Sequence, residues 1–153
     1  MAREAGPRFG PRNVLRWVIV LALGAMALGS GVVAVVVGAG KFGLRLIPTL
    51  AMDVLIATIA WSSIALSAVI AGGFAAAAVL LARQRRAAMW AWMAGFVAAF
   101  AQQALESTQA ANAGAEVDTS GYGVLAMLAV LGWGVYTIDF RRPPALPPRY
   151  RKP

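Results

Sequence analysis

Residues 61–86 read WSSIALSAVIAGGFAAAAVLLARQRR, and this stretch decides the fold. No charged side chain occurs between Trp61 and Ala82, and a basic cluster begins at Arg83. A helix needs about 20 apolar residues to cross the hydrocarbon core of a bilayer. Tryptophan favours the headgroup level, so Trp61 and Arg83 are expected to mark the two membrane surfaces. Residues 61–82 are therefore predicted to form a transmembrane helix.

Three further apolar stretches share this pattern, and the composition agrees with them. Of the 153 residues, 60% are hydrophobic and 13% are charged, whereas soluble domains are about 45–50% apolar and about 25% charged. We predict an all-α integral membrane protein with four transmembrane helices in a compact bundle. The crossings are expected at about 14–38, 61–82, 87–105 and 121–138, within a domain of residues 14–138.

Two of the apolar stretches are unusually long. The stretch 14–38 exceeds the apolar core of about 7–15 residues that is typical of signal peptides, which favours a helix that stays in the membrane. Cleavage at the small residues Gly29, Ser30 and Gly31 is the alternative. Residues 49–82 would form a helix of roughly 50 Å, longer than one crossing needs. Residues 44–60 are therefore predicted to form a protruding or interfacial helical segment that Pro48 starts or kinks.

The basic residues divide by side of the membrane. Residues 1–13, the cluster 83–86 and the tail 139–153 carry nearly all of them, and the other side carries Lys41 and Arg45. Cytoplasmic loops are enriched in Lys and Arg, so both termini are predicted to be cytoplasmic. Abundant Ala, Gly, Val and Arg are typical of GC-rich bacterial genomes, which indicates a bacterial inner membrane. The net charge of +8 is thus interpreted as an orientation signal, with no nucleic acid as partner.

The basic tail is the most distinctive local segment. Its prolines favour an extended polyproline II path. The tail is expected to bind anionic membrane lipids or to dock on a partner subunit, with a plain orientation signal that ends in disordered chain as the alternative. The tail residues concerned are Arg141, Arg142, Arg149, Arg151 and Lys152.

Small residues are expected to bring the helices together. Without a hydrophobic force between helices in lipid, close backbone approach and hydrogen bonds must hold the bundle. Repeated small residues four positions apart predict helix packing at Gly29, Gly31, Ala71, Gly72 and Gly95.

Asp53 is the one acidic residue inside a long apolar stretch. A carboxylate within a membrane is a functional hypothesis by default. Asp53 precedes Arg83 by 30 residues, or about 45 Å of helix, which places it outside the hydrocarbon. We expect a structural role near a helix start, paired with Arg45, with an ion or partner contact as the alternative.

The other polar residues have less specific signals. The hydroxyls of Ser62, Ser63 and Ser67 are expected to bond to carbonyls of their own helix, with bonds between helices as the alternative. Gln102 and Gln103 are expected to meet lipid headgroups, with the lining of a polar path as the alternative. A solvated loop is predicted from Glu106 to Ser120. Its acidic residues could bind a divalent cation, but their spacing matches no recognised calcium-binding pattern. These residues are Glu106, Glu116 and Asp118.

The residue types exclude much chemistry. Cysteine and histidine are both absent, which removes thiolate and imidazole ligands and the usual nucleophile–base sets. No cofactor, metal or enzymatic activity is therefore predicted.

The function predicted by exclusion is a non-catalytic accessory, structural or assembly subunit of a larger inner-membrane complex. Its partners would be membrane lipids and other membrane subunits or further copies of the chain. The first alternative is a small oligomeric transporter or channel for ions or small solutes. It requires a polar face shared by several helices, for which the sequence offers Thr58, Ser62, Ser63, Ser67 and Gln102. The second alternative is a membrane-bound enzyme acting on lipid.

Overall fold

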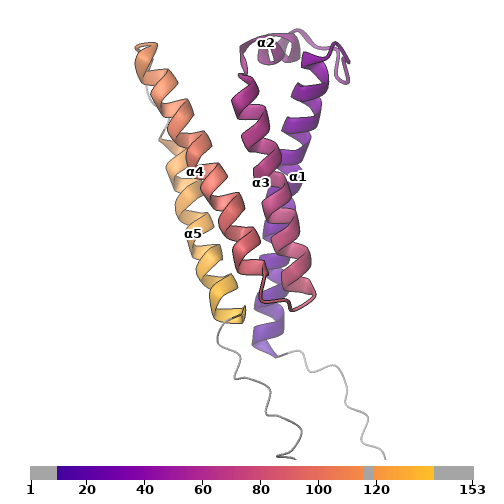
Figure 1. The fold of residues 1–153 in the computed structure, drawn as a ribbon, viewed down its shortest axis with the longest axis vertical. Coiled ribbons are helices and arrows are strands. Elements are labelled where there is room, and N and C mark those ends of the chain that lie inside the picture. Colours follow the sequence, from indigo (N-terminus) through magenta and orange to yellow (C-terminus); the bar gives the residue numbers. More distant parts are fainter. Residues whose placement is uncertain (1–9, 116–118, 140–153) are drawn as a thin grey trace, which may run out of the picture.

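The computed structural model describes residues 10–115 and 119–139, which fold into helices with no strand among them. The helices are α1 (Pro11–Lys41), α2 (Leu50–Thr58), α3 (Trp61–Ala82), α4 (Ala88–Asn112) and α5 (Ser120–Asp139). The four long helices run alternately up and down, and short α2 lies across the end where α1 meets α3 (Figure 1). The start of α1 and the end of α5 consequently lie at the same end of the bundle.

Three of the helices are long and apolar enough to cross a membrane: α1, α3 and α5. The chain is thus a helical protein with the apolar segments of a membrane-embedded one. Helix α4 is longer than α3, but it carries Gln102, Gln103 and Glu106 in its second half and is not among the three. α3 occupies the same residues as the predicted second crossing.

α1 begins earlier than its sequence suggested. The first crossing was predicted to start at about residue 14, yet the helix starts at Pro11. A proline at the first helical position loses nothing, because its missing N–H would have had no partner there. Gly10 precedes it in an extended conformation.

Helices α1, α3 and α4 end in the same way. After α1, Gly43 adopts a positive φ of 82°, Gly43 N–H donates to Gly40 at 2.9 Å and Leu44 N–H donates to Ala39 at 2.9 Å. These paired bonds satisfy carbonyls that a helix end leaves free. Gly114 has the same place after α4, whereas Gln84 occupies it after α3 with a φ of 57°. A left-handed conformation costs a non-glycine residue roughly 1–2 kcal/mol.

The helical segment predicted at 44–60 is shorter than expected. α2 starts after Thr49, whose hydroxyl accepts a bond from Met52 N–H at 3.3 Å. Pro48 disfavours helix in the preceding residue. Extended backbone at Ile59 and Ala60 then separates α2 from α3, so α2 folds over the bundle end instead of extending α3.

The long helices pack in the order α1, α3, α4 and α5, and toward the end that carries α2 they divide into two pairs, α1 with α3 and α4 with α5. α1 packs mainly on α3 and α3 on α4, while α5 has smaller contacts with α4 and α1. From the end with the α3–α4 connection toward the end with α2, α4 and α5 diverge from α1 and α3 (Figure 1). We call the end that carries α2 the wide end, and the end with the α3–α4 connection the narrow end. The bundle is therefore less compact than predicted.

A bond at the narrow end joins the first helix to the last. Arg12 Nη2 donates to the carbonyl oxygen of Ile138 at 2.8 Å, near the end of α5. A cation is favourable there because the final carbonyls of a helix carry partial negative charge. Ile19 also lies against Gly134, so α1 and α5 meet where the two pairs converge.

Two neighbouring glycines of α3 allow a matched test of this packing. A Cβ on Gly73 would lie 2.7 Å from the backbone nitrogen of Gly95, whereas one on Gly72 would meet nothing within 4 Å. We expect Gly73→Ala to lower stability in detergent by about 1–3 kcal/mol through overpacking. Gly72→Ala should leave it unchanged or raise it by about 0.5–1 kcal/mol. Equal unfolding midpoints for the two variants would contradict the α3–α4 contact.

Candidate functional site

The predicted pair of Arg45 and Asp53 is present at the wide end. Arg45 Nη1 lies 3.5 Å from Asp53 Oδ2, and both side chains are partly or largely exposed. Asp53 lies in the first turn of α2, where an acidic side chain favours the helix dipole. Exposed ion pairs contribute about 0–1 kcal/mol. The position of the pair suits a local structural role, and an ion or partner contact there stays a prediction.

The predicted packing positions divide into two groups. Gly31 lies against Ala71, where a Cβ on Gly31 would be 3.6 Å from that of Ala71, and Gly95 lies against the ring of Phe74. A Cβ on Gly29 or on Gly72 would meet nothing within 4 Å, so neither packs against another helix of this chain.

Several close contacts were not among the predicted packing positions. Gly73 touches the backbone of α4, Gly132 lies under the ring of Trp92, and Gly121 lies against Gln103. Two of these contacts pair a glycine with a large side chain. A search for small residues four apart could not have found them.

Some predicted residues lie outside the described part of the chain. These are the tail residues Arg141, Arg142, Arg149, Arg151 and Lys152, and the loop residues Glu116 and Asp118. Glu106, in contrast, is described and is not in a loop. α4 continues to Asn112 because no glycine or proline interrupts it before Gly114.

A cleft separates the two helix pairs toward the wide end. One cavity of about 460 Å³ lies between α1 and α3 on one side and α4 and α5 on the other. A second, of about 260 Å³, continues toward the start of α3 and the end of α2. Both are lined by Val33, Ser67, Gln102 and Glu106, so they are two parts of one cleft. Small-molecule sites occupy roughly 300–1,000 Å³.

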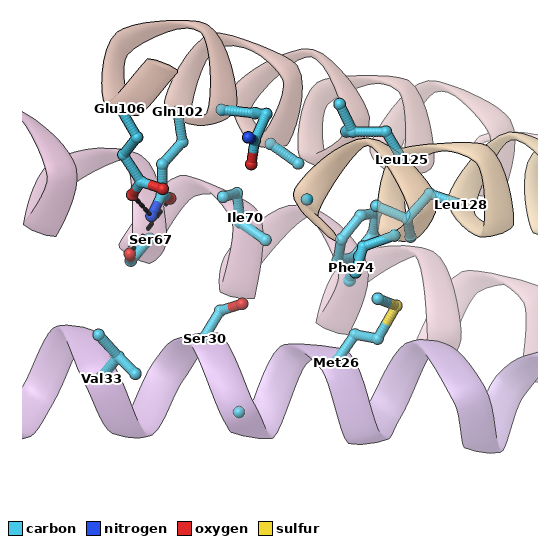
Figure 2. A pocket seen from close by; sticks show the side chains of 15 residues that line it. Met26, Ser30, Val33, Ser67, Ile70, Phe74, Gln102, Glu106, Leu125 and Leu128 are labelled. Atoms are coloured by element: carbon cyan, nitrogen blue, oxygen red, sulfur yellow. Dashed lines mark hydrogen bonds between the residues drawn. The ribbon is translucent and has the colours of Figure 1, made fainter. Parts of the chain in front are cut away.

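The cleft has an apolar end and a polar end. Figure 2 shows Met26, Phe74 and Leu128 gathered at one end, and Ser67, Gln102 and Glu106 at the other. The apolar residues belong to the core, where Phe74 is 1% exposed. The polar residues lie nearer the wide end on α3 and α4.

The polar side chains form a connected chain of bonds. Ser67, 4% exposed, donates from Oγ to Gln102 Oε1 at 3.4 Å. Gln102 Nε2 donates in turn to Glu106 Oε1 at 2.9 Å. The prediction that Ser67 bonds to its own helix is wrong, because its hydroxyl crosses to α4. The headgroup role expected for Gln102 is wrong as well, because its amide turns into the cleft.

The sequence did contain a signal for this face of α4. Gln102, Glu106 and Gln109 follow the spacing i, i+4 and i+7, which places them on one side of a helix. All three line the second cavity, together with Thr58 and Ser63. The signal was missed because the helix was expected to end at Leu105.

The described residues include no group of three His, Cys, Asp or Glu side chains able to hold a metal ion. No protein-family model matches this sequence, and no curated protein and no solved structure matches it either. Any functional conclusion must therefore come from the cleft itself.

Cysteine substitution can test whether water reaches the cleft, because the natural chain contains no cysteine. Ser30 lines the cleft, and Leu28 on the same helix is 72% exposed but does not line it. Thiols react as thiolates, which require water. We expect Ser30→Cys to react with a maleimide in membranes and Leu28→Cys, facing hydrocarbon, to stay unmodified. The reverse order would contradict a hydrated cleft.

Proposed function

We propose that the chain crosses a bacterial inner membrane four times, with the narrow end and both termini in the cytoplasm. α4 lies between α3 and α5, and its polar residues Gln102, Gln103 and Glu106 line the cleft. Helix α4 can therefore cross the membrane although its mean hydropathy is lower than that of α1, α3 and α5.

The distribution of aromatic and basic residues supports this orientation. Exposed Trp17, Trp90 and Trp133 belong to the narrow end, and exposed Trp61 belongs to the wide end. Such aromatic side chains favour the two membrane interfaces. The described basic residues of the narrow end are Arg12, Arg16, Arg83, Arg85 and Arg86, against Lys41 and Arg45 at the wide end. The excess of positive charge favours a cytoplasmic narrow end.

Labelling from outside the cell can count the crossings. We expect Ala113→Cys, next to the α4–α5 connection, to react with a membrane-impermeant maleimide in intact cells. Arg85→Cys, next to the α3–α4 connection, should react only after permeabilisation. A fluorescent protein fused to either terminus should report the cytoplasm. If α4 did not cross, Ala113→Cys would be protected and the C-terminal fusion would lie outside.

Within this topology we propose that the chain binds a small solute in the cleft and belongs functionally with small transporters. The observation that carries this proposal is the convergence of polar side chains from three helices on one cavity. Thr58, Ser63 and Ser67 come from α2 and α3, and Gln102, Glu106 and Gln109 come from α4. Polar side chains inside a membrane protein are costly and usually mark solute paths. A purely structural subunit needs no such polar cavity.

An accessory role in a larger complex is the second candidate, and one face of α3 favours it. Ala68, Gly72 and Ala76 are four residues apart and exposed. In lipid, such a row allows a second helix to approach closely. This face would accommodate a helix of another subunit or of a second copy, while the cleft opens on the other side of α3.

Filling the cleft tests the binding proposal. Val33 is 43% exposed and lines both cavities, and its neighbour Val32, 58% exposed, lines a shallow groove away from the cleft. We expect Val33→Phe to reduce saturable binding of the neutral amphiphile N-phenyl-1-naphthylamine at least several-fold, because its ring occupies the site. The readout is energy transfer from tryptophan to the probe in lipid nanodiscs, with protein-free nanodiscs as blank.

Val32→Phe adds the same side chain to the same helix and should bind the probe as the natural chain does. Equal binding by the natural chain, Val33→Phe and Val32→Phe would contradict a solute site in the cleft.

A further inference from the structure

We propose that the solute of this cleft is a lipophilic cation, held with its apolar body between the helix pairs and its positive group at Glu106. This inference rests on the proposed function and names the chemical class of the solute.

The apolar end sets the first requirement. Ile70, Phe74 and Leu128 are all buried, and they form the floor of the cleft with Met26 opposite (Figure 2). Removing apolar surface from water contributes about 25 cal/mol per Å², so such a floor favours a ligand with an apolar body. The cavity of about 460 Å³ suits a compact organic molecule.

The direction of the hydrogen bonds sets the second requirement. The hydroxyl of Ser67 donates to the amide oxygen of Gln102, and the amide nitrogen of Gln102 donates to Glu106. Each donor therefore points toward the carboxylate, where the chain of bonds ends in acceptor oxygens. A carboxylate accepts more than one hydrogen bond, so it retains sites for a donor from the solute. A positively charged donor makes the stronger bond.

The charged side chains around the cleft determine which charge of solute it favours. Among the residues that line the two cavities, Glu106 is the one charged side chain. Both described cations of the wide end have other contacts: Arg45 pairs with Asp53, and Lys41 Nζ donates to the carbonyl of Ala57 at 3.5 Å. No described cation lies within ion-pair distance of Glu106. The site is complementary to a cation and unfavourable to an anion.

The depth of Glu106 suits a solute that arrives from lipid. It lies 18 residues beyond Ala88, about 27 Å along α4, which is close to the thickness of the hydrocarbon core. α1 and α5 form the side of the first cavity that would face lipid. Gly29 and Val33 of α1 and Val124 and Leu128 of α5 line it there. A lipophilic cation in the outer leaflet would hold its charge at the headgroup level and its body below. It could enter between α1 and α5 in that orientation.

Two ions of equal shape and opposite charge test the sign of the site. Tetraphenylphosphonium and tetraphenylborate are titrated into the purified full chain in a non-ionic detergent, with equilibrium dialysis as the readout. Each affinity is divided by that of the natural chain for the same ion, which removes the different partition of the two ions into micelles. Neither ion has a hydrogen-bond donor, so the comparison measures the Coulomb interaction with Glu106, which corresponds to about a tenfold change in affinity or more near a protein surface.

Glu106→Gln should weaken binding of the phosphonium about tenfold or more and leave binding of the borate unchanged or stronger. Glu106→Asp, which keeps the charge, should retain most of the phosphonium binding. Asp53→Asn removes a carboxylate of the same end outside the cleft and should change neither affinity. Thermal midpoints of the variants in the same detergent show that they remain folded.

The outcomes separate this inference from the proposed function. If Val33→Phe weakens both ions and Glu106→Gln changes neither, or weakens both equally, the cation inference is overturned and a solute site in the cleft stands. If the natural chain binds neither ion saturably but binds the neutral probe, the same conclusion holds. If Val33→Phe changes the binding of no probe, the solute site itself is overturned.

Discussion

Backbone contact between α3 and α4 is the constraint on which the rest of the structure depends. Gly73 lies against the backbone of Gly95, and the ring of its neighbour Phe74 also lies against Gly95. Helices in lipid gain nothing from apolar contact as such, so they need close approach of this kind. Ser67 lies six residues from Gly73 and Gln102 lies seven residues from Gly95, about two helical turns in each helix, toward the wide end. The glycine contact thus sets the register that brings the serine hydroxyl and the amide within reach of each other.

The same contact explains why the polar residues are tolerated. An unpaired hydroxyl or amide in an apolar environment costs several kcal/mol, roughly 2–7. Ser67 is buried but bonded to Gln102, and Gln102 is bonded to Glu106, which is exposed at the rim of the cleft. Burial therefore decreases from Ser67 through Gln102 to Glu106, and the charged side chain is the most exposed of the three. The buried floor at Phe74 and the exposed carboxylate are two ends of one gradient.

Much of the fold could be predicted because the bilayer limits what a sequence can do. Trp61 and Arg83 bracket α3 correctly, since both residue types have a preferred depth. The site was harder to find, because Gln102 and Glu106 were interpreted by their distance from the expected end of a crossing and not by the face of the helix they share. The separation of α2 from α3 at Ile59 and Ala60 has no sequence signal, since neither residue breaks a helix. The contact between Gly132 and Trp92 depends on tertiary packing alone.

The connectivity of the chain has a mechanical consequence. α1, α2 and α3 are joined to one another at the wide end, and so are α4 and α5. The covalent link between the two groups is the short segment after Ala82, at the narrow end, where Arg12 also reaches the end of α5. The two helix groups are therefore hinged at the narrow end. At the wide end the two groups could separate or approach each other around a solute without any change in the length of a connecting segment.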